Sequence, residues 1–148
     1  MLRYMLYETN GERFAVSKEI EYLNNYVELQ QLRFSDDVTV QVTMENSDSN
    51  CTIEPMLLIP FVENAFKHGI GLVKDPYIKI SLQVKEQYLY FQVINNYSRD
   101  NTSKDNNSGI GLANVRNRLQ LLYGNQYTLN IQDNGEVYNA SLKLALSC

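Results

Sequence analysis

Residues 60–69 of this chain, PFVENAFKHG, decide how the rest of the sequence is interpreted. On an α-helix of about 3.6 residues per turn, their side chains separate into an apolar half and a polar half. The apolar half holds Phe61, Val62, Ala65 and Phe66, and the polar half holds Glu63, Asn64, Lys67 and His68. Proline suits the first turn of a helix, and glycine suits its end. The stretch therefore predicts one amphipathic helix.

The polar half of this helix has side chains suited to a Mg-nucleotide. The carboxamide of Asn64 and the carboxylate of Glu63 carry oxygen donors that suit Mg²⁺. Lys67 lies one turn further along and can meet a phosphate as a point charge, and the carboxylate can accept or orient a proton. An ordinary amphipathic helix with a mixed polar face explains the same residues equally well, so this stretch alone leaves both interpretations open.

Alternation of apolar and polar side chains predicts strands on either side of this helix. The alternating segments are residues 38–44, 78–84, 89–93, 127–131 and 138–144. A short turn at residues 85–87 and the pair Asn134-Gly135 predict two antiparallel hairpins. Because strands and helices are interleaved, we expect an α+β two-layer sandwich. Its sheet is mixed but largely antiparallel, with helices on one face.

A second helix is predicted from Ser17, a plausible N-cap, to about Phe34. Its apolar side chains form two stripes, with Ile20, Leu23 and Val27 on one and Tyr22, Tyr26 and Leu29 on the other. Two stripes suggest a helix that contacts two neighbours, such as a bundle mate and the following domain. A single broad buried face is the alternative.

The loop at residues 96–108, NYSRDNTSKDNNS, has the composition of a lid, a binding loop or a disordered segment. The sequence GIGLANVRNRLQLLYG follows and predicts a helix ending at Gly124. The apolar stripe of this helix is Leu112, Val115, Leu119 and Leu122. Two glycines before a helix let the backbone approach a ligand, at which the first helical amides point. A lone GxG is weak evidence for such a site.

Composition narrows the possible functions. The chain has 148 residues, 44% of them hydrophobic, and a net charge of −4, which argues against a nucleic-acid partner. The sequence shows no signal peptide, and its longest apolar run is too short to span a membrane. Cys51 and Cys148 are isolated, so we expect reduced thiols in a cytoplasmic setting, with no disulfide framework and no zinc site. The glycine-rich fingerprints of Rossmann and P-loop nucleotide sites are absent.

Three segments together resemble a known family. PFVENAFKHG resembles the N box of the GHKL ATPase/kinase superfamily, INNYSRD lies where a G1 box is expected, and SGIGLANVRNRLQLLYG resembles the G2 box of LytS-type sensor histidine kinases. The upstream segment SKEIEYLNNYVELQQLRF is similar to that family's signature before its ATP-binding domain. The resemblance covers nearly the whole chain. It implies a Bergerat-type ATP-binding domain at residues 35–148, preceded at residues 1–34 by the end of a dimerisation and linker region.

The resemblance also implies roles for individual residues. Asn64 would bind the Mg²⁺ that bridges the ATP phosphates, Glu63 would orient or accept a proton, and Lys67 and His68 would line the phosphate path. Gly109 and Gly111 would let the lid close, with the helix that begins near Leu112 behind them. Asn95 would meet the adenine amino group. ATP and Mg²⁺ are thus the expected cofactors, and catalysis would consist of positioning and charge neutralisation.

The chain departs from the family pattern at two places. Asn95 and Tyr97 stand where the G1 box has aspartate and glycine, which puts ATP affinity in question. The family's phosphoacceptor histidine is also missing, because the only histidine is His68 in the N box. We therefore expect a fragment whose acceptor helix, sensor and any membrane anchor lie upstream. Its expected partners are ATP, its own phosphoacceptor helices in a homodimer, and a response regulator.

Two other functions remain open at this stage. A non-catalytic member of the same fold would act as an interaction module or pseudokinase, and Asn95 and Tyr97 favour this reading. A GHKL protein of another class, such as an anti-sigma serine kinase, is the other possibility. The linker-type helix upstream of residue 35 argues against it.

Overall fold

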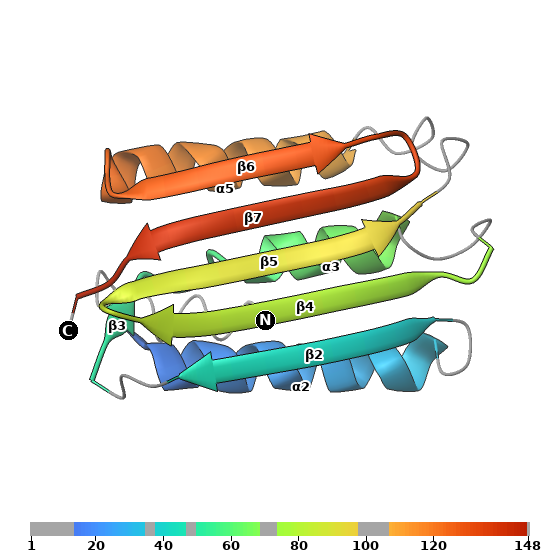
Figure 1. Ribbon diagram of the computed structural model, residues 1–148, viewed down its shortest axis with the longest axis horizontal. Coiled ribbons are helices and arrows are strands. Elements are labelled where there is room, and N and C mark those ends of the chain that lie inside the picture. Colours follow the sequence, from blue (N-terminus) through green and yellow to red (C-terminus); the bar gives the residue numbers. More distant parts are fainter. Residues whose placement is uncertain (1–13, 35–37, 47–49, 69–73, 98–106, 148) are drawn as a thin grey trace.

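The computed structural model describes residues 14–34, 38–46, 50–68, 74–97 and 107–147, and Figure 1 shows a two-layer arrangement. One layer is a five-stranded sheet, and the helices lie together on one of its faces. The helices are α2 (Val16–Phe34), α3 (Ile59–His68) and α5 (Asn107–Tyr123). The strands of the sheet are β2 (Thr39–Asn46), β4 (Tyr77–Lys85), β5 (Tyr88–Asn96), β6 (Tyr127–Asp133) and β7 (Val137–Ala145).

The order of strands in the sheet is β2-β4-β5-β7-β6. β2 runs parallel to β4, and the other three pairings are antiparallel. The predicted fold class, an α+β sandwich with a mixed and largely antiparallel sheet covered on one face, is therefore confirmed. A separate two-stranded sheet pairs β1 (Phe14–Ala15) with β3 (Thr52–Ile53), and the sequence patterns did not predict it.

Both predicted hairpins are present, and both turns use positive φ values, which glycine favours and Glu86 and Gln87 do not. Glu86 and Gln87 connect β4 to β5 with φ values of 54° and 67°. Two successive positive φ values are characteristic of the type I′ turn, which matches the twist of the strands. The β6–β7 turn places Gly135 at φ 90°, where a side chain would be strained. The turns thus fix the register of β4 against β5 and of β6 against β7.

The core lies between the sheet and the helices. The apolar half of α3 is buried as expected: Phe61, Val62, Ala65 and Phe66 all belong to the core. The inward-facing residues of β4, β5 and β7 alternate with outward-facing ones along each strand, so the sheet buries a single face. β2 is an edge strand, which explains why its valines are only partly covered.

α2 buries one of its two predicted stripes and part of the other. Leu23 and Val27 enter the same core as the sheet residues. Tyr26 of the second stripe is half-buried and meets the Phe66 ring of α3 edge-on, with centroids 6.2 Å apart. Leu29 is exposed, so the second stripe is only partly covered within the described residues, and a bundle mate for it stays a prediction. α3 continues past this position, because the Phe66 ring also stacks on Phe34 with centroids 6.3 Å apart.

The packing of α5 differs from prediction at its last turn. Val115 and Leu119 are buried as expected, but Leu122 is 42% exposed and Tyr123 is buried in its place. Tyr123 is preferred because its hydroxyl accepts a hydrogen bond from the Glu54 backbone N–H at 3.0 Å. Gly124 then ends the helix at φ 57°.

One expectation about the cysteines is wrong. Cys51 is buried and disulfide-bonded rather than reduced. The only other cysteine of the sequence, Cys148, lies outside the described residues. The residues next to the two cysteines are hydrogen-bonded to each other, because the Thr52 N–H donates to the Ser147 carbonyl at 2.7 Å. Chain segments almost a hundred residues apart are thus adjacent, which composition could not reveal.

Candidate functional site

Several of the predicted site residues lie on elements that meet at one end of the molecule. Figure 1 shows the C-terminal end of α3, the N-terminal end of α5 and the C-terminal end of β5 at this same end. α3 and α5 also contact each other on the helix-covered face of the sheet. Asn64, Asn95 and the glycines of α5 are therefore carried by neighbouring elements on one face. This arrangement forms the candidate site.

The polar half of α3 has residues in different environments. Asn64 and Glu63 are half-buried, and Lys67 is exposed. His68 closes the helix, but its side chain lies outside the described part of the chain. The amide oxygen of Asn64 is the kind of donor that Mg²⁺ accepts, and Lys67 places an ammonium on the exposed side of the same helix.

Glu63 faces α2 as well as the site. Its carboxylate lies near enough to the hydroxyls of Tyr22 and Tyr26 to raise the pKa of each, after burial itself. Burial likewise raises the pKa of the Glu63 carboxyl, and the Lys67 ammonium opposes that rise. α2 therefore supplies the surroundings of a predicted catalytic side chain, which the separate patterns of the two helices did not suggest.

Asn95 is the buried polar residue on the floor of the site. It is 1% exposed, at the end of the central strand β5, and on the face that the helices cover. Its Nδ2 donates to the Asn96 carbonyl at 3.1 Å, and this bond directs the amide oxygen away from the strand end. The Oδ1 atom finds no hydrogen-bond partner among the described residues. A buried acceptor in this state suits a ligand that donates a hydrogen bond.

Asn96 has a structural role. Its Oδ1 accepts from the Tyr77 N–H at 2.9 Å, and its Nδ2 donates to the Asp75 carbonyl at 3.1 Å. These bonds tie the end of β5 to the start of β4. Asn95 is held in place as a consequence, because it directly precedes this anchored residue.

Tyr97 and Asp133 were not predicted to interact. The Tyr97 hydroxyl donates to Asp133 Oδ1, and the Tyr97 N–H donates to the Glu136 carbonyl at 2.9 Å. Asp133 lies opposite Tyr138 of β7, which in turn lies opposite Asn95 of β5. These residues form a polar row across the sheet at the candidate site.

Tyr138 and Arg116 complete that row from the strand and helix layers. Burial raises the pKa of the half-buried Tyr138 hydroxyl; the Arg116 guanidinium opposes the rise, and the Asp133 carboxylate adds to it. Arg116 belongs to α5, so the helix layer reaches the sheet at this point. Sequence patterns missed both residues. The only signal was that Tyr138 shares the inward phase of the last strand.

The predicted glycines are placed differently from expectation. α5 begins at Asn107, so Gly109 and Gly111 lie inside its first turns and not before the helix. Leu112 follows them and is partly buried against the core. Most of the polar loop that was predicted to be a lid, residues 98–106, lies outside the described residues.

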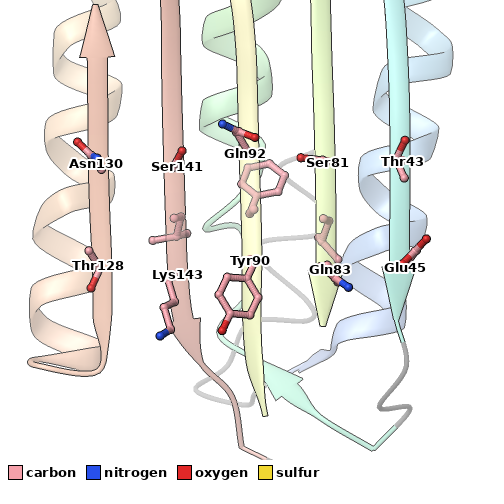
Figure 2. A pocket seen from close by; sticks show the side chains of 13 residues that line it. Thr43, Glu45, Ser81, Gln83, Tyr90, Gln92, Thr128, Asn130, Ser141 and Lys143 are labelled. Atoms are coloured by element: carbon pink, nitrogen blue, oxygen red, sulfur yellow. The ribbon is translucent and has the colours of Figure 1, made fainter. Parts of the chain in front are cut away.

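A hollow of about 490 Å³ lies on the opposite face of the sheet and contains none of the predicted site residues. Figure 2 shows a row of short polar side chains crossing it from strand to strand: Thr43, Ser81, Gln92, Ser141 and Asn130. Tyr90 and Lys143 lie beside them. This hollow is the curved solvent face of the sheet, so it is distinct from the candidate site.

Hydrogen bonds from α5 to the segment before α3 hold these two helices of the candidate site together. Arg118 of α5 donates through Nη2 to the Pro55 carbonyl at 2.9 Å and through Nη1 to the Met56 carbonyl at 3.2 Å. These two residues lie just before α3, and Met56 has a positive φ of 63°. One side chain thus fixes how α3 enters the core relative to α5.

Comparison with known proteins places this fold in a defined class of catalytic domain. The catalytic domain of histidine kinase ThkA superposes with a TM-score of 0.60 at 14% identity, covering 90% of this chain and 94% of that domain. Full-length ShkA, solved in complex with AMPPNP, gives a TM-score of 0.63 at 10% identity, covering 92% of this chain and 31% of ShkA. These likenesses establish the fold, a histidine kinase catalytic-domain architecture.

Sequence comparison points in the same direction. Residues 1–38 match the family model described as Histidine kinase. The chain is 30% identical over 143 residues to the sensor protein kinase HptS of Staphylococcus aureus strain USA300. That match covers 88% of this chain and 27% of HptS, so the chain spans about a quarter of the relative's length. No helix within the described residues is long and apolar enough to cross a membrane.

Proposed function

We propose that this chain is the ATP-binding catalytic part of a two-component sensor histidine kinase of the LytS type. The observation that carries the proposal is the buried Asn95 amide, whose Oδ1 lacks a partner among the described residues. Asn95 lies near the C-terminal end of β5, at the end of the molecule where α3 ends and α5 begins (Figure 1). The sensor kinase HptS and the AMPPNP complex of ShkA support it by similarity.

The residues present fit a Mg-ATP complex. The Asn95 acceptor matches the exocyclic amino group of adenine, and the Asn64 amide oxygen is a suitable Mg²⁺ ligand. When bound, Mg²⁺ neutralises charge on the phosphates. Lys67 and His68 line the path of the phosphates, and the first turn of α5, which contains Gly109, directs backbone amides toward them, with Gly111 and Leu112 following in the next turn.

Glu63 orients or accepts a proton near the γ-phosphate, and its carboxylate also faces the tyrosines of α2. Lys67 is exposed and can follow a charge that shifts during transfer. With these residues the chain's own contribution is binding, orientation and charge stabilisation.

The phosphoryl acceptor in this proposal is a histidine that is not His68, because His68 closes the phosphate-binding helix α3. It belongs to a dimerisation segment that residues 1–34 adjoin, and residues 35–148 are the ATP-binding domain. The phosphoryl group then passes to an aspartate of a response regulator. A homodimeric, membrane-anchored parent protein with this domain in the cytoplasm completes the proposal.

Isothermal titration calorimetry of this chain with ATP, in the presence and absence of Mg²⁺, tests the proposal. We expect saturable binding that strengthens with Mg²⁺, and we expect Asn64→Ala to lose the strengthening by Mg²⁺. Asn130→Ala, on the outer face, is the matched control and should behave as wild type. Binding that ignores Mg²⁺ in the wild type would contradict the role of Asn64.

A second candidate function is a pseudokinase or interaction module of the same fold. The presence of Asn95 and Tyr97 in the base-binding region favours it, because an amide carries no charge and a tyrosine is bulky. Absence of any heat with millimolar ATP and Mg²⁺, from a protein with a normal thermal transition, would support this function and reject the first.

A further inference from the structure

Tyr97 is a bulky residue close to Asn95, so the position of its ring decides whether Asn95 can meet a ligand. Its N–H pairs with the Glu136 carbonyl, so the extended chain of β5 continues through it. Two residues after Asn95 on an extended chain, its side chain leaves on the same, helix-covered face. A phenol ring at this position either covers the Asn95 acceptor or turns away from it.

The ring turns away because its hydroxyl is bound elsewhere. Tyr97 donates to Asp133 on β6, and β6 lies two strands from β5 with β7 between them. Two strand spacings amount to about 10 Å. The hydroxyl is therefore held to the side of Asn95, whose buried Oδ1 has no hydrogen-bond partner among the described residues.

Asp133 is positioned for this task by its own turn. Its Oδ1 also accepts from the Gly135 N–H at 2.9 Å, so the carboxylate is oriented before Tyr97 reaches it. It points to the helix-covered face, in phase with the half-buried Leu129 and Ile131 of β6. A hydrogen bond to a carboxylate is stronger than one between neutral groups.

We propose that Asp133 is a positioning residue that holds the Tyr97 ring out of the base-binding region beside Asn95. This inference rests on the proposed nucleotide function and adds a specificity device to it. Without the carboxylate, another staggered χ1 rotamer turns the ring back along β5 and over the Asn95 acceptor. The tether thus lets a bulky residue occupy this position while the buried Asn95 acceptor remains unpaired and available to a heterocyclic amine that enters the site.

The test is a set of variants titrated with Mg-ATP and, separately, with Mg-tripolyphosphate. Tyr97→Phe removes only the hydroxyl, and Asp133→Ala removes its acceptor. Each should weaken ATP binding by about tenfold and leave tripolyphosphate binding unchanged, because tripolyphosphate lacks the base. The double variant Tyr97→Gly/Asp133→Ala should recover wild-type ATP affinity, since no ring remains to be held.

Asn134→Ala is the matched control for damage to the turn. Asn134 Oδ1 accepts from the N–H groups of Glu136 at 2.9 Å and Val137 at 2.8 Å, so it supports the same turn as Asp133. This variant should bind ATP as wild type does. Equal weakening by Asn134→Ala, unchanged affinity in Tyr97→Phe and Asp133→Ala, or failure of the double variant to recover would each overturn the inference.

A nucleotide-free measurement separates this inference from the proposed function. In Asp133→Ala we expect nuclear Overhauser contacts between the Tyr97 ring and the Asn95 side-chain amide, and none in the wild type. Such contacts in the wild type, or their absence in the variant, would overturn the inference whether or not ATP binds. A wild type that binds neither ATP nor tripolyphosphate defeats the proposed function alone.

Discussion

Both faces of the five-stranded sheet carry side-chain amides, but the hydrogen bonding of these amides differs between the two faces. On the outer face, Gln92 donates to Asn139 Oδ1 at 3.1 Å, and the Ser141 hydroxyl donates to the same oxygen at 3.3 Å. On the inner face, Asn95 is 1% exposed, and its Oδ1 has no partner among the described residues. An unpaired buried acceptor costs about 1–3 kcal/mol.

This difference teaches where to look for function. The outer face contains the hollow, but its polar groups face solvent or pair with one another. Among the described residues, the inner face contains one buried side-chain amide, Asn95, which is held in a costly state near the end of β5. A cost that folding alone does not explain is a reason to expect a ligand at that place.

Substitutions of two neighbouring residues on β5 test the difference between the inner and outer faces, and they have the largest expected effect on stability. Phe91 is 2% exposed on the inner face, and Tyr90 is 41% exposed on the outer face. We expect Phe91→Ala to lower the free energy of unfolding by about 3–5 kcal/mol, since it leaves a cavity. Tyr90→Ala should cost well under half as much. Urea denaturation measures both, and equal losses would refute the assignment of faces.

A second pair lies on α5. Arg118→Ala removes two hydrogen bonds to backbone carbonyls that precede α3, and we expect a loss of about 2–3 kcal/mol. Arg116→Ala, two residues earlier and exposed, should cost less than about 0.5 kcal/mol. Thermal unfolding followed by circular dichroism reports both. A lysine at position 118 should not restore stability, because it cannot make the forked contact.

Replacing the unpaired amide should separate stability from binding. Asn95→Leu removes a buried acceptor without a partner, so we expect the free energy of unfolding to rise by about 1 kcal/mol. Mg-ATP affinity should fall by at least about tenfold, because the base loses its acceptor. The outer-face control Gln92→Leu should leave affinity unchanged. A variant at position 95 that is less stable yet binds normally would contradict the role given to this amide.

The smallest expected effect concerns pH. Burial and the Glu63 carboxylate raise the pKa of Tyr26 to about 12. Its unfolded value is about 10, so its contribution to stability is complete below pH 10 and is lost as pH rises toward 12. Tyr26→Phe should therefore lose less stability than the wild type over this interval. Equal alkaline slopes in urea titrations at pH 9 and 11 would contradict this account.

Much of this fold could be predicted from local pattern. Period-two alternation predicted the five long strands, and Asn134-Gly135 predicted the last turn. The split of residues 60–69 into apolar and polar halves predicted the buried face of α3, which the structure confirms. These features depend on residues a few positions apart, and short-range rules describe them well.

The rest depended on contacts between distant segments. Nothing near Tyr97 indicates that its hydroxyl meets Asp133, 36 residues later, and nothing near Arg118 indicates the carbonyls of Pro55 and Met56. The helical period alone could not predict whether Leu122 or Tyr123 is buried, because the burial of Tyr123 depends on its hydrogen bond with the Glu54 N–H. The disulfide of Cys51 was missed for the same reason. The roles of the candidate site residues remain predictions, although the structure places several of their elements together.

The most direct test of the central claim is an amide chemical-shift map of the ¹⁵N-labelled chain titrated with Mg-ATP. The account predicts perturbations at Asn64, at Asn95 with its side-chain amide, and at the first turn of α5, with the outer-face residues Thr43, Ser81 and Gln92 unmoved. Shifts confined to that outer row, or none at saturating ATP, would contradict it.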